Sequence, residues 1–178
     1  MINVDYIKTW KEVMKSPSHF YSEMPKTGGY FYPIVFAIGS VAIMLFCVLL
    51  IYPLIFPEIG NTIKLTYMEI SLIVIFLFVM YILGLLMNSA ILYITYKILG
   101  GKGSYEGTVG VVCYATAALV LAWIPLIGLI FGFYQTYLYL VGGKFIHGMG
   151  IFRSAIALIM SLLLVFVFAG LVSMSVFA

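Results

Sequence analysis

The chain has 178 residues, of which 65% are hydrophobic and only 8% are charged. Soluble domains are about half apolar and a quarter charged, so this composition excludes a water-soluble globule. The formal net charge of +3 is small, and no basic run interleaves with aromatic residues as a nucleic-acid-binding surface requires. We therefore expect the lipid bilayer to be a partner and nucleic acid not to be one.

Residues 1–30 are the most polar part of the chain, and we expect them to form a cytoplasmic arm. No secretory signal is recognisable, so the arm is expected to be retained. Over residues 4–15, apolar residues recur at helical spacing while Lys8, Lys11 and Lys15 gather on the opposite face. With Trp10 on the apolar face, this pattern is typical of a helix anchored in the cytoplasmic interface. The alternative is that the apolar face packs onto the cytoplasmic ends of a helix bundle.

Four stretches of the chain carry no charged residue and exceed the ~20 residues that cross a bilayer: 27–57, 70–96, 107–143 and 154–178. The third stretch is too long for one helix, and Pro125 near its centre interrupts helical geometry. Dividing it gives an all-α integral membrane protein: a five-helix transmembrane bundle over 31–178, preceded by the amphipathic arm. The helices are expected over 31–56, 67–99, 107–123, 125–142 and 151–177.

The distribution of basic residues predicts the orientation, because loop Lys and Arg tend to stay on the cytoplasmic side. With five crossings and a cytoplasmic N-terminus, eight of the nine basic residues lie inside and only Lys64 lies outside. A re-entrant hairpin over 107–143, which enters and leaves on the cytoplasmic side, gives the same count. The charges therefore support a multi-pass protein and leave the path of the third stretch open.

The apolar stretches contain no ionisable residue at depth, and their neutral polar residues are the candidate functional groups. Asn88, Gln135 and Thr116 are expected either to bond to a neighbouring helix or to line a solute path. Gly128 and Gly132 form a small-xxx-small pattern, which is a candidate helix-packing face.

Catalytic, cofactor and metal sites are not indicated by any motif. The glycine-rich segment at 100–104 lacks the spacing of a phosphate-binding loop and is expected to be a helix stop. His147, beside Lys144, is expected to be a solvated loop residue, and Cys47 and Cys113 are expected to be buried, reduced thiols. We therefore expect no enzymatic activity, no cofactor and no metal.

The order of several short motifs resembles the Yip1-domain family of five-helix membrane proteins. The matching pieces are Trp10, Pro17 and Phe20 before the first helix, LGGKGSY at 99–105, VCYA at 112–115, IPLIG at 124–128 and GMGIFRSA at 148–155. The resemblance implies a cytoplasmic N-terminus and five membrane helices. The chain looks like the short bacterial and archaeal form, because it lacks the long cytosolic region and the Asp-Leu-Tyr-Gly-Pro segment of the eukaryotic branch. A Rab GTPase partner, known for that branch, is therefore not expected.

Two functions follow as hypotheses for a protein of a prokaryotic cytoplasmic membrane. The first is a non-enzymatic scaffold or adaptor, which works by packing against itself as a homo-oligomer, against lipid, or against another membrane protein. The second is a small-solute transporter or channel, favoured by the glycine- and proline-broken middle helices and by a GGK repeat 42 residues apart. A polar path through Asn88 and Gln135 would distinguish the second from the first.

Overall fold

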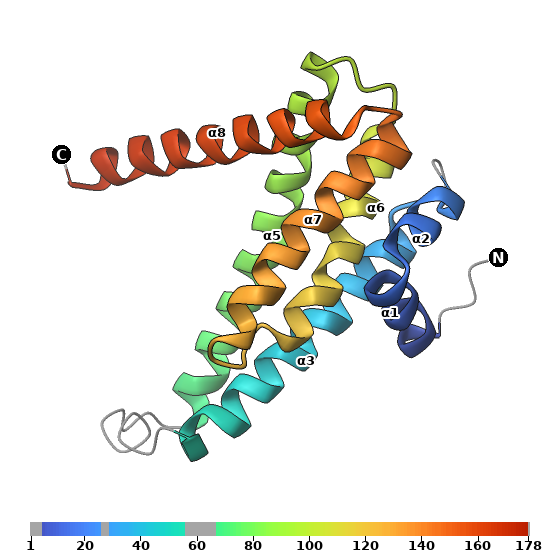
Figure 1. Ribbon diagram of the computed structural model, residues 1–178. Helices are drawn as coiled ribbons and strands as arrows, with labels where there is room; N and C mark the ends of the chain where they lie inside the picture. The colour runs from blue at the N-terminus through green and yellow to red at the C-terminus, as the bar shows by residue number, and fades with distance from the viewer. Residues whose placement is uncertain (1–4, 26–28, 56–66, 178) are drawn as a thin grey trace.

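The computed structural model describes residues 5–25, 29–55 and 67–177, and throughout these ranges the regular structure is helical (Figure 1). The elements are α1 (Tyr6–Lys15), α2 (Pro17–Glu23), α3 (Phe31–Ile55), α5 (Tyr67–Ile98), α6 (Tyr105–Ala115), the 3₁₀ helix η1 (Thr116–Leu121), α7 (Ile127–His147) and α8 (Ile151–Phe177). The all-α prediction is confirmed.

The helices α3, α5, α6 and α7 run side by side, with α1 and α2 against one flank (Figure 1). One apolar core joins this flank to the bundle and includes Val13, Phe36 and Leu138. A second core joins α5, α6 and α8 and includes Leu92 and Leu158. The first part of α8 packs on α5 and α7, and its later part projects away from the other helices.

Two of the described helices are long and apolar enough to cross a membrane: α3 over Phe31–Ile51 and α5 over Ser71–Ile98. Only 22% and 6% of these segments' most apolar windows are buried, so most of their surface faces outward, unlike the core helix of a soluble protein. Tyr105–Leu121 and Ile151–Val167 are shorter apolar helical segments. Length and apolarity thus identify two candidate spans and do not establish five.

The third charge-free stretch forms a broken hairpin. The expected helix over 107–123 is α helical only to Ala115 and continues as the 3₁₀ helix η1. The hydroxyl of Thr116 donates to the carbonyl of Cys113 at 2.6 Å, where the change begins. The chain then turns at Pro125 and Leu126, and Leu126 has a φ of 66°, which is uncommon for a residue with a side chain.

The return helix α7 does not end near residue 142, as the sequence suggested, but continues to His147. Gly142 and Gly143 lie inside this helix. Close neighbours leave no room for a side chain at either position, and this, rather than a turn, explains why both are glycines. A Cβ at Gly142 would overlap the γ-methyl groups of Val111. The helix stop is Gly148, whose φ of 62° lies in the left-handed region.

The arm lies along the side of the bundle rather than over its ends (Figure 1). The indole N–H of Trp10 donates to the carbonyl of Ala117 at 2.9 Å, and the hydroxyl of Tyr134 donates to the carbonyl of Met14 at 2.7 Å. The hydroxyls of Tyr6 and Ser40 lie 2.9 Å apart. The bundle residues in these contacts are Ala117 of η1, Tyr134 of α7 and Ser40 of α3. The helix α1 is therefore fixed to the side of the bundle, away from the loop that carries Lys102.

Candidate functional site

The junction between the arm and the bundle contains the cavities that we treat as the candidate site. The chain enters this junction through α2, which begins at Pro17. The fixed φ of proline suits the first turn of a helix. The helix α2 then buries Tyr21, whose hydroxyl donates to the carbonyl of Val111 at 3.2 Å. Phe20 packs edge-on against Tyr114, with 4.9 Å between ring centroids. Aromatic contacts of this kind hold the arm against α6 and leave gaps between rings.

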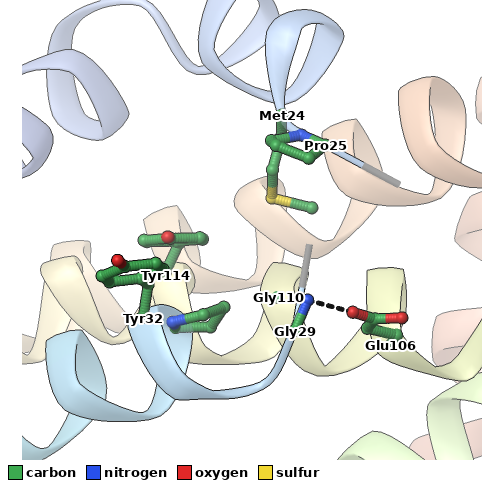
Figure 2. A pocket seen from close by; sticks show the side chains of 8 residues that line it. Met24, Pro25, Gly29, Tyr32, Glu106, Gly110 and Tyr114 are labelled. Atoms are coloured by element: carbon green, nitrogen blue, oxygen red, sulfur yellow. Dashed lines mark hydrogen bonds between the residues drawn. The ribbon is translucent and has the colours of Figure 1, made fainter. Parts of the chain in front are cut away.

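A small cavity of about 30 Å³ lies where α2 leads into α3 (Figure 2). Met24, Tyr32, Glu106 and Tyr114 line it, together with Pro25, Gly29, Pro33 and Gly110. The carboxylate of Glu106 accepts a hydrogen bond from the backbone N–H of Gly29. A Cβ at Gly110 would lie 3.0 Å from the terminal carbon of Met24, so the glycine admits that side chain. The described residues therefore place one carboxylate and two phenol groups on the wall of this cavity.

Two further cavities follow the inner side of α1. The larger, of about 290 Å³, lies between α1 and α3 and shares Tyr32 and Tyr114 with the first cavity; Tyr6, Thr9, Val35, Phe36 and Gly39 complete its wall. The smaller, of about 200 Å³, is an open surface groove lined by Tyr6, Ile7, Trp10, Val120 and Leu121, of which Ile7 is 62% exposed. The ring of Tyr6, stacked on Phe36 at 4.8 Å, stands between the two.

His147 occupies a second notable place, at the ends of α5, α6 and α7. It is completely buried, so the expectation of a solvated loop residue was wrong. The glycine-rich loop wraps around it: the N–H of Lys102 donates to the His147 carbonyl at 2.9 Å. A Cβ at Gly103 would lie 2.8 Å from the imidazole Nδ1. The sequence feature that could have indicated this burial was the pair of adjacent glycines before Lys102, which we interpreted only as a helix stop.

The hydrogen bonds of His147 indicate its tautomer. Its Nε2 lies 2.9 Å from the hydroxyl of Thr108, which can donate its own proton to the carbonyl of Ser104 at 3.1 Å. His147 is then the donor at Nε2, and Nδ1, which has no partner among the described residues, holds only a lone pair. An unpaired lone pair costs less than an unpaired N–H in this position. Burial, aided by the positive charge of Lys97, lowers the pKa of His147 to about 4.

The candidate polar residues do not meet one another. Gln135 donates to the hydroxyl of Tyr139 on its own helix at 3.1 Å, and Thr116 also bonds within its own helical segment. Asn88 is half-buried on α5, and its amide bonds to no other residue in the described part of the chain. Gln135 and Thr116 thus bond locally rather than to a neighbouring helix, because short polar side chains can reach carbonyls or hydroxyls one turn away. For Asn88, the choice between an interhelical bond and a solute path stays a prediction. Neither Asn88 nor Gln135 lines the cavities described above.

The two glycines of the small-xxx-small pattern in α7 have different surroundings within this chain, and their role as a helix-packing face stays a prediction. A Cβ at Gly128 would overlap the carbonyl of Ala122 in the turn before it, whereas a Cβ at Gly132 would meet nothing within 4 Å. Gly128 thus serves the turn, and Gly132 faces outward from this chain. The side chains of Lys8, Lys11 and Lys15 are exposed on the outer face of α1, and Trp10 faces the bundle. Their role as an interfacial anchor stays a prediction.

The outward-facing apolar helices and the scarcity of charge define the class: this is an all-helical membrane protein. The family follows from comparison, because the model of the Yip1 domain matches residues 11–174. The chain belongs to the Yip1 family, as its motifs predicted. Comparison with curated proteins and with solved structures found no match.

Proposed function

We propose that the protein is a non-enzymatic membrane scaffold or adaptor of a prokaryotic cytoplasmic membrane, with a cytoplasmic N-terminus. The observation that carries this proposal is how the deep polar groups are bonded. The side chains of Ser89, Thr116, Gln135 and Ser161 all bond within their own helices. Such bonding leaves these four side chains, within the part of the chain that the structure describes, without the free polar groups that line a transport path.

The transporter remains the second candidate, and Asn88 is the residue that favours it. A half-buried amide on an apolar helix, with no partner among the described residues, is costly unless water or a solute is its partner. A path through the bundle would supply such a partner, and a lipid-facing amide at the bilayer surface would find water without any path. The two explanations differ in what replacement of the amide does to flux.

The test is flux through Asn88→Leu and wild-type protein in proteoliposomes. We expect neither to raise ion conductance or glycerol-driven swelling above that of protein-free vesicles. We also expect the variant to be as stable as the wild type within about 1 kcal/mol. A wild-type flux that a stably folded Asn88→Leu protein loses would establish the transporter and overturn the scaffold.

For the topology, we propose that α3, α5 and α8 cross the membrane and that the hairpin of α6, η1 and α7 is re-entrant. The support comes from α1, whose charged side chains Asp5, Lys8, Lys11, Glu12 and Lys15 are all exposed. Charged residues at the centre of a bilayer cost about 2.5–3.5 kcal/mol each on insertion scales, so this face belongs at or above the hydrocarbon boundary. The level at which α1 docks therefore marks where hydrocarbon begins on that flank.

The depth of the hairpin follows from that level. From Ala117, the partner of Trp10, η1 continues for only four residues to Leu121, about 8 Å at the rise of a 3₁₀ helix. That is far less than a hydrocarbon core of about 30 Å. From Ser40, the partner of Tyr6, α3 continues for 15 residues to Ile55, about 22 Å, which is shorter than the hydrocarbon core but nearly three times the depth reached by η1. Figure 1 shows α3 and α5 running on beyond the hairpin turn. Five crossings, the arrangement implied by the family resemblance, is the competing topology.

A further inference from the structure

Four basic residues surround the end of the bundle that carries the glycine-rich loop. Lys97 lies at the end of α5 and Lys102 lies in the loop to α6. Lys144 lies in the last turn of α7, and Arg153 lies in the first turn of α8. All four side chains are exposed, and Figure 1 shows these segments together at one end of the bundle. We call these four residues the basic end cluster.

Close packing at Gly143 brings three of these cations to one place. A Cβ on Gly143 would overlap the hydroxyl oxygen of Ser154 and would lie 2.9 Å from the ring of Tyr96. The helix α7 therefore contacts α8 and α5 at this one residue, with no side chain between the backbones. A basic residue adjoins each of the three in the sequence: Lys144, Arg153 and Lys97.

The glycine-rich loop adds the fourth cation. The backbone N–H of Lys102 donates to the carbonyl of His147 at 2.9 Å, and the rings of His147 and Tyr96 lie 4.5 Å apart between centroids. Lys97 is also near His147, because its charge contributes to lowering the pKa of that imidazole. Tertiary contacts among α5, α7, α8 and the loop therefore assemble the cluster.

Little acidic charge balances the cluster. Between residues 97 and 153 the sequence contains one acidic residue, Glu106, whose carboxylate accepts a hydrogen bond from the backbone N–H of Gly29. Within the described residues, none of the four basic side chains forms an ion pair with a carboxylate. Like charges gathered on one surface create a positive potential that attracts anions. The complementary partner of the cluster is therefore anionic.

Exposed apolar side chains lie directly beside the cations and indicate the source of the anion. Ile98 follows Lys97 and is 63% exposed, and Phe152 precedes Arg153 and is 83% exposed. A soluble anion would use the cations and leave these apolar side chains in water. A phospholipid can use both, because its phosphate meets the cations while its acyl chains meet the apolar side chains. Basic surfaces at the cytoplasmic ends of membrane helices bind anionic headgroups in this way.

We propose that the basic end cluster binds an anionic phospholipid of the cytoplasmic leaflet, of the phosphatidylglycerol class. The phosphodiester lies among the four cations, and the acyl chains lie beside Ile98 and Phe152. One lipid molecule then joins the end of α5 to the start of α8. This inference goes beyond the proposed function, since it applies to a scaffold and to a transporter alike. It requires only that this end of the bundle is cytoplasmic, which holds in both topologies.

Native mass spectrometry of the full chain in a neutral detergent counts the bound lipids directly. Dioleoyl phosphatidylglycerol and dioleoyl phosphatidylcholine have the same acyl chains, so their difference in affinity reports on the headgroup alone. We expect phosphatidylglycerol to bind at least about tenfold more tightly, a difference of about 1.4 kcal/mol. Inorganic phosphate in excess should not displace it. Equal affinities for the two lipids, or displacement by phosphate, would overturn the proposal.

Two double substitutions remove charge from the cluster. Lys144→Gln with Arg153→Gln should reduce the preference for phosphatidylglycerol at least about fivefold, because each basic residue near a membrane surface adds to the attraction. Lys97→Gln with Lys102→Gln should have the same effect and tests the cluster a second time. All four positions are exposed, so the melting temperature should change little in either variant. A folded cluster variant that keeps the full preference would contradict the site.

The arm supplies the matched control. Lys8→Gln with Lys11→Gln removes the same charge from exposed positions on the outer face of α1 and should leave the preference unchanged. Lys144→Arg with Arg153→Lys keeps the charge of the cluster and should also bind like the wild type. A loss in the arm variant as large as that in the cluster variants would show a general effect of net charge and would overturn the proposal, whatever the flux and topology experiments show.

Discussion

His147 shows at the scale of one residue how burial changes the chemistry of a side chain. The imidazole is enclosed by the glycine-rich loop and lies near the ring of Tyr96, with 4.5 Å between centroids. In the proposed topology, its position beyond the charge-free stretch that ends at Gly143 puts it outside the membrane-crossing part of the chain. Since Nε2 already donates to Thr108, protonation would add an unpartnered N–H at Nδ1 against the loop.

A pH dependence of stability follows from the lowered pKa of His147. The unfolded chain binds the proton at the ordinary value of about 6.5, whereas the folded chain binds it only near 4. The contribution of His147 to stability is therefore complete above pH 6.5 and is lost as the pH falls toward 4. We expect the melting temperature in detergent to drop across this window, and His147→Gln to drop less. Parallel curves for the two proteins would show that His147 is not the titrating group.

Two glycines of α7 provide a comparison of packing. Gly142 faces the γ-methyl groups of buried Val111, with Cγ2 2.6 Å from where a Cβ would stand, whereas Gly132 faces open space. We expect Gly142→Ala to destabilise the protein by about 1–3 kcal/mol through overpacking. Gly132→Ala should stabilise it by up to about 1 kcal/mol, because alanine is the better helix former. Thermal unfolding of the two variants in one detergent measures both, and equal effects would contradict the described packing.

At the scale of elements, α1 is attached to the bundle by an apolar contact and by a few directed hydrogen bonds. Trp10→Phe removes the bond to Ala117, and Tyr134→Phe removes the bond to Met14. Each loss should weaken the docked arm by about 0.5–1.5 kcal/mol. Hydrogen exchange of the amides in residues 6–15 should accelerate accordingly, without a change in α5. Tyr137→Phe is the control, since that ring contacts Tyr134 but its hydroxyl bonds to no described residue.

At the scale of the whole molecule, single cysteines labelled from outside intact cells test the path of the hairpin. Leu126 is the best position, because it lies in the turn and its side chain is 89% exposed. The re-entrant hairpin predicts that Leu126→Cys stays unlabelled from outside, whereas five crossings predict labelling. Lys102→Cys, exposed in a loop that both topologies place in the cytoplasm, is the negative control. His147 is unsuitable as a probe position because it is buried on either topology.

A second position gives the positive control for the same experiment. Asn61 lies in the sequence between the two long helices and is outside the described residues. The cysteine of Asn61→Cys should be labelled from outside if α3 and α5 both cross the membrane. Residue 178 should be labelled as well if α8 crosses, and it also lies outside the described residues. Labelling at position 61 without labelling at position 126 supports the re-entrant hairpin. Labelling at both 61 and 126 would establish the full crossing of η1 and α7.

The sequence by itself determined the class of the protein and most of its helices, because composition and apolar run length are summed over many residues. Bounds of the long helices followed from charged ends such as Lys97 and Glu69, since a charge marks where an apolar helix meets water. The family followed from the order of motifs, which the match over residues 11–174 confirmed. The sequence also predicted that residues 4–15 are amphipathic, but it did not predict which surface their apolar face contacts.

Only the tertiary structure decided how those elements contact one another. The bond between His147 and Thr108 joins residues 39 apart in the sequence, and the bond between Trp10 and Ala117 joins residues 107 apart. Apolar periodicity shows that a face must be covered but does not say by what, because hydrophobic contact is non-directional. Gly142 illustrates the same limit: the GGK repeat suggested that a helix ends there, whereas Gly142 lies inside α7 and fits against Val111. Its neighbour in space, and not its neighbours in sequence, assigns this role.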